Sequence, residues 1–430
     1  MGKTEDKVLI IGQGGREHAL ARVFQKSGLF KKVFVAPGNP LMEFLERVEC
    51  VSELSYREPS KIVDFCRSQR IALVYVSPDN ALAEGLVDVL VGDGIKAFGP
   101  TKGAARLEGS KIFAKKLMLE AQVPTAHPLF MGSYHDAKDF VARSCLKLPL
   151  VLKADGLALG KGVVVCETAQ DLEEAWDFLK GHQNLVIEEV LRGREVSLFY
   201  FCAGREAYYF DSACDYKRLL VGNKGPNTGG MGSYRYHAET TLVTFTTQKI
   251  VLPILEALHR CGSPYFGILY VGLMITNEGP KVLEFNARLG DPEAQCLLPL
   301  YDPGELCEMF QSIAIDRRIP LRDLRPRVQH SVHVVKVSEG YPASEMKLGQ
   351  DIQGLDQLEQ WPENCFIFGA GITKHMSGRW LNSGGRVLGV TVISNDPCEA
   401  YQKAHEYIKK IQFNGGFSRG DVGAELCRGL

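Results

Sequence analysis

The sequence lacks the charge imbalance and the repeated spacings that mark several classes of protein. Its 50 lysines and arginines almost cancel its 51 aspartates and glutamates, which argues against a basic stripe for nucleic acid or a polybasic membrane patch. It shows no apolar run of membrane-spanning length, roughly 18 residues. No Cys-x-x-Cys pair occurs among its 12 cysteines, and its 10 histidines have no metal-ligand spacing. These absences predict a cytoplasmic protein with no nucleic-acid and no membrane partner.

What the sequence does contain is an alternation of strand-like and helix-like segments. Short apolar runs at 8–11, 33–36 and 73–76 are each soon followed by Gly or Pro. This rhythm predicts an N-terminal parallel sheet covered on both faces. Residues 148–200 have the pattern of a small α+β domain, a larger mixed segment follows to about residue 325, and a mostly β tail ends the chain. Helices are expected at 61–67, 82–90, 110–121, 169–179 and 397–411, with Ser110 as a cap.

A glycine-rich turn joins the first predicted strand to the first predicted helix. The sequence around it is KVLIIGQGGREHAL, and Arg16 adds a positive charge. Backbone N–H groups at a helix start favour phosphate, so this turn is a candidate phosphate seat. The third glycine of a dinucleotide fingerprint would fall at Glu17, which argues against a dinucleotide site. A packing turn without a ligand gives the same pattern, and His18 is expected to be structural.

Two further segments suggest nucleotide chemistry. VLKADGLALGKGVVV (151–165) is a predicted hairpin in which Lys153 and Lys161 flank the turn, so two lysines could neutralise a polyphosphate. A surface hairpin with solvated lysines is the alternative. VIEEVLRGREVS (186–197) offers extended backbone for an adenine edge and carboxylates for ribose hydroxyls. A charged hairpin is the stronger interpretation of these residues alone, and only the neighbouring lysine hairpin favours the nucleotide site.

The most informative stretch is LEFNARLGDPEAQ (283–295). Glu284, Asn286 and Arg288 alternate with apolar residues, so a strand would place the three polar side chains on one surface. A carboxylate and an amide oxygen at i and i+2 suit Mg²⁺, with phosphates and water completing the shell, and an arginine can hold a carboxylate or phosphate. A solvent-facing amphipathic strand is the alternative interpretation.

Taken in order, these motifs resemble one enzyme family. GGREHALA, VAPGN, FGPTKGAARLEGSK, VPTA, KADGLALGKGV, GPNTGGMGSY, LEFNARLGDPEAQ, GGRVLGVT and DVG occur in the order shown by the glycinamide ribonucleotide synthetases of the ATP-grasp superfamily. The resemblance implies ATP-dependent ligation of glycine to 5-phosphoribosylamine through a glycyl phosphate, in purine biosynthesis. It implies Mg²⁺ or Mn²⁺ as cofactor, ATP as co-substrate, and a monomer or weak homodimer.

The resemblance also implies a mixed α/β and α+β fold in several domains. These are a pre-ATP-grasp parallel-sheet domain over 1–105, an ATP-grasp region of two lobes over 106–325 with its small lobe at about 125–193, and a small mostly β C-terminal domain over 326–430. GPNTGGMGSY (225–234) is poor as helix or strand, because glycine and proline disfavour both. It is therefore expected to form a loop that closes over the reacting groups.

The implied site residues fall into four groups. The metal ligands are Glu284 and Asn286, and the catalytic residues are Arg288, Asp215 and Lys217. ATP contacts are expected from Lys111, Lys153, Lys161, Glu188, Glu189, Val190, Leu191, Glu195, Arg218 and Asn227. Substrate contacts are expected from Gly14, Gly15, Arg16, Glu17, Gly229, Gly230, Met231 and Asp291, with the ribosylamine phosphate on the Gly12–Arg16 turn.

The sequence departs from the family pattern at three places and leaves other functions open. Asp79 stands where the family usually has glutamate, Tyr216 where histidine is common, and Leu289 where phenylalanine is common. The substitution at Asp79 puts a ribose contact from that loop in doubt. The alternatives are another ATP-grasp carboxylate–amine ligase, a nucleotide-binding regulatory module without catalysis and, more remotely, a nicotinamide oxidoreductase.

Overall fold

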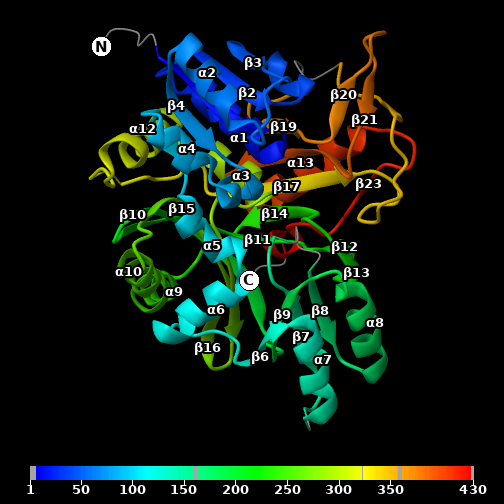
Figure 1. The fold of residues 1–430 in the computed structure, drawn as a ribbon. Helices are drawn as coiled ribbons and strands as arrows, with labels where there is room; N and C mark the ends of the chain where they lie inside the picture. Colours follow the sequence, from blue (N-terminus) through cyan, green and yellow to red (C-terminus); the bar gives the residue numbers. More distant parts are fainter. Residues whose placement is uncertain (1–5, 145, 158–161, 322, 357–360, 428–430) are drawn as a thin grey trace.

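The structure is a computed structural model, and it describes residues 6–144, 146–157, 162–321, 323–356 and 361–427 (Figure 1). The N-terminal part is a five-stranded parallel sheet in the order β3-β2-β1-β4-β5, as the alternating apolar runs predict. Its elements are β1 (Lys7–Gly12), α1 (Gly15–Lys26), β2 (Lys32–Pro37), η1 (Pro40–Phe44), β3 (Val48–Cys50), α2 (Pro59–Gln69), β4 (Ile71–Val76), α3 (Asp79–Glu84), α4 (Leu86–Gly92) and β5 (Ala97–Phe98).

The helix expected over residues 82–90 is wrong as one element, because it divides into α3 and α4 at Gly85. That residue adopts φ +93°, a left-handed conformation that glycine accepts without strain. Two helices, α5 (Lys102–Gly109) and α6 (Lys111–Glu120), then lead out of this part. The expected cap of α6 is confirmed, since the Ser110 hydroxyl accepts a hydrogen bond from the Phe113 N–H at 3.1 Å.

A small antiparallel sheet, β6-β9-β7-β8, forms a separate lobe with two helices, which lies at the lower right of Figure 1. Its elements are β6 (Pro128–Ser133), α7 (Tyr134–Arg143), β7 (Leu150–Ala154), β8 (Val163–Cys166), α8 (Ala169–Leu179) and β9 (Asn184–Glu189). The predicted helix 169–179 is confirmed at both ends, whereas α7 was missed. This lobe has its own hydrophobic core around Leu152, Trp176 and Ile187, so it packs as a unit of its own.

The largest sheet has nine strands in the order β16-β15-β10-β11-β14-β17-β22-β19, with β23 paired to β17. It runs from the middle of the chain into the C-terminal part, because β14 pairs with β17. Its strands are β10 (Arg194–Gly204), β11 (Glu206–Asp215), β14 (Gly232–Arg235), β15 (Tyr265–Thr276), β16 (Gly279–Asn286), β17 (His330–Val337), β19 (Cys365–Gly369), β22 (Arg386–Ser394) and β23 (Phe417–Ser418).

Helices and short β elements complete the molecule. The helices are α9 (Thr240–Thr246), η2 (Thr247–Val251), α10 (Leu252–Arg260), α11 (Glu293–Leu297), η3 (Leu298–Leu300), α12 (Pro303–Gln311), η4 (Ser312–Asp316), α13 (Pro397–Lys410) and η6 (Ala424–Cys427). The strands are β12 (Arg218–Leu220) and β13 (Lys224–Asn227), which form a hairpin, and β18 (Asp351–Ile352), β20 (Ile372–Lys374) and β21 (Trp380–Asn382), which form a three-stranded sheet.

One helical stretch among the described residues, Thr240–Arg260, is long and apolar enough to cross a membrane by length and composition alone. The expectation that no such run exists is therefore wrong on that measure. Ile250, Ile254 and Leu258 of this stretch are fully buried in the hydrophobic core that joins the N-terminal part to the large sheet. One face of the stretch therefore packs on this core, and a helix with a buried apolar face can pass the same test as a membrane span.

Segment 225–234 is not the open loop that its glycines and proline suggested. Residues 225–227 belong to β13, and residues 232–234 begin β14 within the large sheet. Between them, the Met231 N–H donates to the Tyr216 carbonyl at 2.8 Å, and Thr228 is buried. The segment is therefore paired or packed over most of its length, and closure of GPNTGGMG over the reacting groups stays a prediction.

Candidate active site

Glu284 and Asn286 lie at the end of β16, and the structure brings basic groups from distant parts of the chain toward them. Lys217, just after β11, has its Nζ 3.5 Å from Glu284 Oε1 and forms an ion pair with Glu195 of β10. Burial acts to raise the pKa of Glu284, but Lys217, Lys111 and Lys153 outweigh it and lower that pKa. The carboxylate is therefore ionised at neutral pH and surrounded by cations.

Two of these lysines come from the small lobe and from the helix that leads into it. Lys111 opens α6, and its Nζ donates to the Gly156 carbonyl at 2.8 Å. Lys153 lies in β7, and its Nζ donates to the Leu283 carbonyl at 3.2 Å. Burial and the neighbouring Lys153 charge lower the pKa of Lys111, while Glu284 opposes them. The two ammonium groups repel each other, and an anion bound between them would relieve this repulsion. Lys161, the other predicted hairpin lysine, lies outside the described residues.

Glu188, for which the resemblance implied a nucleotide contact, lies beside Lys153, another of the residues expected to contact ATP. Its side chain is buried, with the residue 1% exposed, and it forms ion pairs with both Lys153 and Lys115. Lys115 was not singled out from the sequence; its Nζ lies 2.7 Å from Glu188 Oε2 and donates to Thr125 Oγ1 at 2.8 Å. The described contacts of Glu188 are thus with buried lysines.

The remaining predicted nucleotide contacts lie around the junction between the small lobe and the large sheet. Val190 and Leu191 are partly buried in the link between β9 and β10, and Glu189 Oε1 accepts the His127 N–H at 2.9 Å. Arg218 and Asn227 face each other across the β12–β13 hairpin, where Arg218 Nη1 donates to the Gly225 carbonyl at 2.7 Å.

Arg288 lies beyond the end of β16 and is tied to the protein by acidic groups. Its Nη2 is 2.7 Å from Glu108 Oε1 and 3.9 Å from Asp79 Oδ2. The Asn286 amide, oriented with its nitrogen toward Glu108, donates to the same Glu108 Oε1 at 2.9 Å. Glu108 therefore orients both Asn286 and Arg288, a role that sequence reasoning missed although RLEGSK was among the recognised motifs.

The N-terminal glycine turn is filled by Glu17. The Gly14 N–H donates to Glu17 Oε2 at 2.6 Å, and the Ser77 hydroxyl donates to Glu17 Oε1 at 2.5 Å. Arg16 Nε lies 2.7 Å from Glu17 Oε1, and its Nη1 donates to the Leu289 carbonyl at 3.1 Å. The Gly14 N–H expected to be available for a phosphate is thus already used by a carboxylate. Glu17, expected to contact substrate, is a buried brace of the turn.

His18 is structural, as expected. Its Nδ1 accepts the Gly369 N–H at 3.0 Å, which ties α1 to β19, and burial together with Arg22 lowers its pKa to about 3. The imidazole is therefore neutral at physiological pH and holds two parts of the fold together.

Asp291 and Gly229 both bind the side chain of one arginine from the C-terminal part. Arg386 Nη2 lies 3.0 Å from Asp291 Oδ2, and its Nη1 donates to the Gly229 carbonyl at 2.6 Å and to the Asp291 carbonyl at 2.7 Å. Burial acts to raise the pKa of Asp291, but Arg386 and Arg16 outweigh it and lower that pKa. Arg386 was missed as a site residue, although its motif GGRVLGVT was recognised.

Gly230 and Met231 serve packing in this structure. Gly230 has φ +111°, and a Cβ built on it would lie 2.4 Å from Pro292 Cδ. The Met231 side chain is fully buried, its N–H is paired with Tyr216, and its carbonyl accepts the Val335 N–H at 3.0 Å. This placement gives no support to a substrate contact through the Met231 side chain.

Asp215 lies at the end of β11, close to Lys217 and Glu293. Burial and the Glu293 charge raise the pKa of Asp215 well above its usual value, and Lys217 opposes them. Two carboxylates and one lysine in a buried setting suit the binding of a substrate ammonium group, which would relieve the repulsion between the acids.

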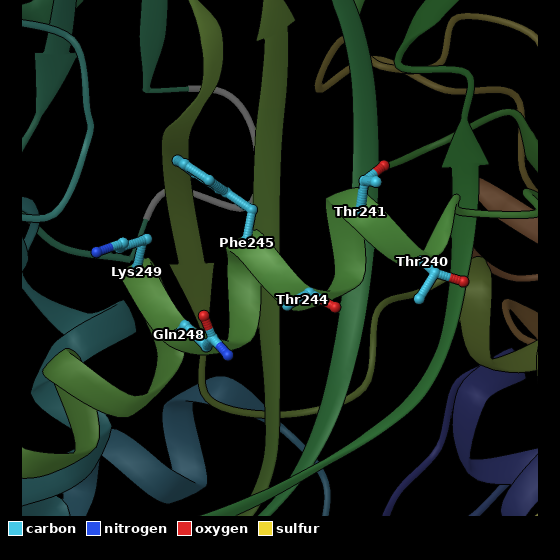
Figure 2. Close-up of a pocket in the computed structure, with 6 residues that line it drawn as sticks. All are labelled: Thr240, Thr241, Thr244, Phe245, Gln248 and Lys249. Atoms are coloured by element: carbon cyan, nitrogen blue, oxygen red, sulfur yellow. The ribbon is translucent and has the colours of Figure 1, made fainter.

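A surface hollow lies elsewhere, on the outer side of α9 and η2. Figure 2 shows it lined by Thr240, Thr241, Thr244, Phe245, Gln248 and Lys249. All six residues belong to one helical stretch, and none of them is among the basic or acidic groups around Glu284. The candidate active site is therefore defined by the converging charged side chains and not by this hollow.

The donor set around Glu284 fits a magnesium ion shared with phosphates. No cluster of three or more His, Cys, Asp or Glu side chains arranged to hold a metal occurs in the described part of the chain, so a cage made wholly of protein is absent there. Mg²⁺ typically takes one or two carboxylates and completes its shell with phosphate oxygens and water. The Glu284 side chain is 37% exposed and ionised, and the Asn286 amide nitrogen faces Glu108, which leaves the amide oxygen for another partner.

Comparison with known proteins shows which family has this architecture. Residues 6–108, 109–294 and 331–425 match the N domain, the ATP-grasp (A) domain and the C domain of phosphoribosylglycinamide synthetase. The chain belongs to the phosphoribosylglycinamide synthetase family. It is 38% identical to a phosphoribosylamine–glycine ligase of Caldanaerobacter subterraneus over 97% of this chain and 99% of that one.

Solved structures agree with this membership. A crystal structure of phosphoribosylamine–glycine ligase from Thermotoga maritima is similar with a TM-score of 0.81 and 30% identity, over 97% of this chain and 100% of that one. Biotin carboxylase from Campylobacter jejuni is similar with a TM-score of 0.70 at 16% identity, over 98% of this chain and 94% of that one. The second likeness is one of fold alone.

Proposed function

We propose that this chain is a phosphoribosylamine–glycine ligase. It joins glycine to 5-phosphoribosylamine in an ATP-dependent step of purine biosynthesis, and it releases ADP and phosphate. The observation that carries the assignment is the convergence of Lys111, Lys153 and Lys217 on the ionised Glu284, within a chain similar over its full length to enzymes of that name.

The chemistry requires an activated carboxylate. The glycine carboxylate attacks the γ-phosphorus of ATP and ADP leaves, which gives glycyl phosphate. The amine of phosphoribosylamine then attacks the carbonyl carbon, and phosphate leaves with the former carboxylate oxygen. Positioning and charge neutralisation supply most of the acceleration in phosphoryl transfer, and basic side chains around Glu284 are suited to both.

Each charged group has a proposed role. Lys111 and Lys153 neutralise ATP phosphates, and Lys217 balances the acidic groups Glu195 and Glu284 while ATP binds. Arg288, oriented by Glu108, steadies the transferring phosphoryl group or the glycine carboxylate. The partly buried Arg288, held at 2.7 Å from Glu108 Oε1, has little freedom to move, which is what a preorganised electrostatic site needs.

Mg²⁺ or Mn²⁺ would be held by Glu284 and Asn286. When bound, the ion supplies charge neutralisation to the ATP phosphates. The protein's own contribution is to keep the Glu284 carboxylate ionised and to hold the Asn286 amide through Glu108, as the contacts of those residues support.

The substrates are proposed to bind where the three parts of the chain meet. Asp215 and Asp291 are candidates for the glycine ammonium group. Gly15 and Arg16 remain candidates for the ribosylamine phosphate, with Glu17 bracing the turn. Gly229 and Gly230 contribute backbone next to Asp291, since Arg386 clamps the Gly229 and Asp291 carbonyls together.

The remaining nucleotide contacts are proposed from their positions. Glu189, Val190 and Leu191 lie in the link between the lobes and are candidates for adenine contacts, with Glu195 for the ribose. Arg218 and Asn227 are placed on the adjoining hairpin. We also propose a cytoplasmic monomer or weak homodimer without nucleic-acid or membrane partners, in keeping with near-zero net charge and free cysteines in the described part of the chain.

A product assay tests the proposed activity. The purified chain is incubated with ATP, Mg²⁺, labelled glycine and freshly generated phosphoribosylamine, and ADP and labelled product are measured with each substrate omitted in turn. We expect one glycinamide ribonucleotide per ADP and no product without any one substrate. ADP release that depends on a different carboxylate or amine would assign the chain to another ligase, and nucleotide binding without ADP release would make it a regulatory module.

A further inference from the structure

Tyr216 lies between two proposed active-site residues, Asp215 and Lys217, and is 7% exposed. Its hydroxyl donates a hydrogen bond to the Glu425 carboxylate and accepts one from the Gly423 N–H at 2.9 Å. Both partners come from the last described residues of the chain, about two hundred positions away. The C-terminal tail therefore contacts the residue next to Lys217 directly.

The same tail holds the backbone that follows Lys217. Arg419, 1% exposed, donates from Nη1 to the Arg218 carbonyl at 2.7 Å, and its guanidinium lies over the Tyr216 ring at 4.6 Å from the centroid. Asp421 pairs with Arg419 at 2.6 Å and accepts the Gly222 N–H at 3.0 Å. Charge-assisted bonds of this kind are stronger than neutral ones, so the tail forms a clamp on residues 216–222.

On the opposite side, this segment is fixed by the large sheet and the GPNTGGMG motif. The Tyr216 N–H donates to the Gly232 carbonyl at 3.0 Å, and the Thr228 N–H donates to the Lys217 carbonyl at 2.7 Å. The backbone at Lys217 is thus held on two sides, and the Lys217 side chain extends from it to Glu195 and Glu284. The geometry at the ammonium group depends on where that backbone is held.

We propose that Tyr216 is a positioning residue of the ligation reaction, through which Glu425 and Gly423 of the C-terminal tail hold Lys217 between Glu195 and Glu284. This inference rests on the proposed function and assigns the tail a part in it. Removing the hydroxyl leaves the ring and its contact with Arg419 but breaks both hydrogen bonds to the tail.

The chain provides a matched control on β11, the strand that ends just before Tyr216. The Tyr208 hydroxyl in β11 also bonds to one carboxylate and one backbone N–H. It donates to Asp323 Oδ1 at 3.2 Å and accepts the Leu324 N–H at 2.8 Å. It lies at the other end of the strand from Asp215, and Asp323 and Leu324 are not among the proposed site residues. Tyr208→Phe therefore removes a chemically similar pair of bonds away from Lys217.

The experiment compares Tyr216→Phe and Tyr208→Phe with the unchanged full chain in the ligation assay. We expect Tyr216→Phe to lower kcat by between about tenfold and a hundredfold, as displacements near 1 Å at a reacting centre do, and to change the Mg²⁺ concentration for half-maximal rate. Tyr208→Phe should leave both values within about twofold of the unchanged chain. Melting temperatures of the two variants show whether each remains folded.

A double-mutant cycle with Lys217→Met decides whether Tyr216 acts through Lys217. We expect the Tyr216→Phe effect to shrink below about twofold in the Lys217→Met background, because the group being positioned is gone. Equal kcat for Tyr216→Phe and the unchanged chain, or fully additive effects in the cycle, would overturn the positioning role. If the unchanged chain makes no glycinamide ribonucleotide, the proposed function itself fails, and the two failures are thereby distinguished.

Discussion

Removing the Glu188 carboxylate is predicted to lower the stability of the fold. The main effect is expected in the free energy of unfolding and not in the Kd for ATP. Glu188 is 1% exposed, while Lys115 and Lys153 are 4% and 9% exposed, and it forms an ion pair with each. Burial lowers the pKa of Lys115 and Glu188 raises it, so Lys115 depends on this partner for its charge. Breaking a buried pair costs about 3–5 kcal/mol. We expect Glu188→Ala to lower the free energy of unfolding by about that amount.

Urea unfolding at pH 7 measures this effect, and the next residue is the control. Glu189 has a side chain that is 43% exposed and lies 3.8 Å from Lys281, so Glu189→Ala should cost less than about 1 kcal/mol. A loss below about 1 kcal/mol for Glu188→Ala, together with a large rise in the Kd for ATP, would refute the buried-pair reasoning. It would favour a direct nucleotide contact, as the family resemblance implies.

Three further predictions concern the site and its supports. Glu284→Gln should reduce ADP formation by at least about 100-fold at all Mg²⁺ concentrations, and a normal rate would remove Glu284 from the site. Gly230→Ala should cost about 1–3 kcal/mol, because its φ is +111° and the added Cβ meets Pro292, whereas Gly181→Ala, with open space around it, should be near neutral in thermal unfolding. The depressed pKa of Asp291 stabilises the fold above the unfolded-state pKa, and that stability is lost as pH falls through the folded pKa. The stability gap between Asp291→Asn and the unchanged chain should therefore be large at pH 7 and shrink below about pH 4; a gap independent of pH would contradict the linkage.

Local patterns in the sequence predicted local structure well. The apolar alternation predicted the parallel N-terminal sheet, and the helix at 169–179 and the Ser110 cap were recovered because both depend on neighbouring residues. Segment 225–234 was misjudged because glycine and proline disfavour isolated strands, whereas here β13 pairs with β12 in a hairpin and β14 is held between β11 and the distant β17. Tertiary pairing overrode local propensity at that place.

The partners of the site residues could not be predicted for the same reason. The sequence singled out Glu284 and Asn286, but it gave no sign that Glu108 would hold Asn286 or that Arg386 would clamp Asp291. These contacts join residues about one hundred to two hundred positions apart, and only packing of the three parts brings them together. The partners of Glu188 were not predicted either. Its motif implied a nucleotide contact, and the partners that the structure shows for its side chain are two buried lysines.

The central claim, activation of the glycine carboxylate by ATP, is tested most directly by following oxygen atoms. Glycine labelled with ¹⁸O in both carboxylate oxygens is converted with phosphoribosylamine and ATP, and the inorganic phosphate is examined by mass spectrometry. The account predicts one ¹⁸O atom in each phosphate released, because the phosphorylated oxygen leaves with phosphorus. Product formed together with unlabelled phosphate would contradict it.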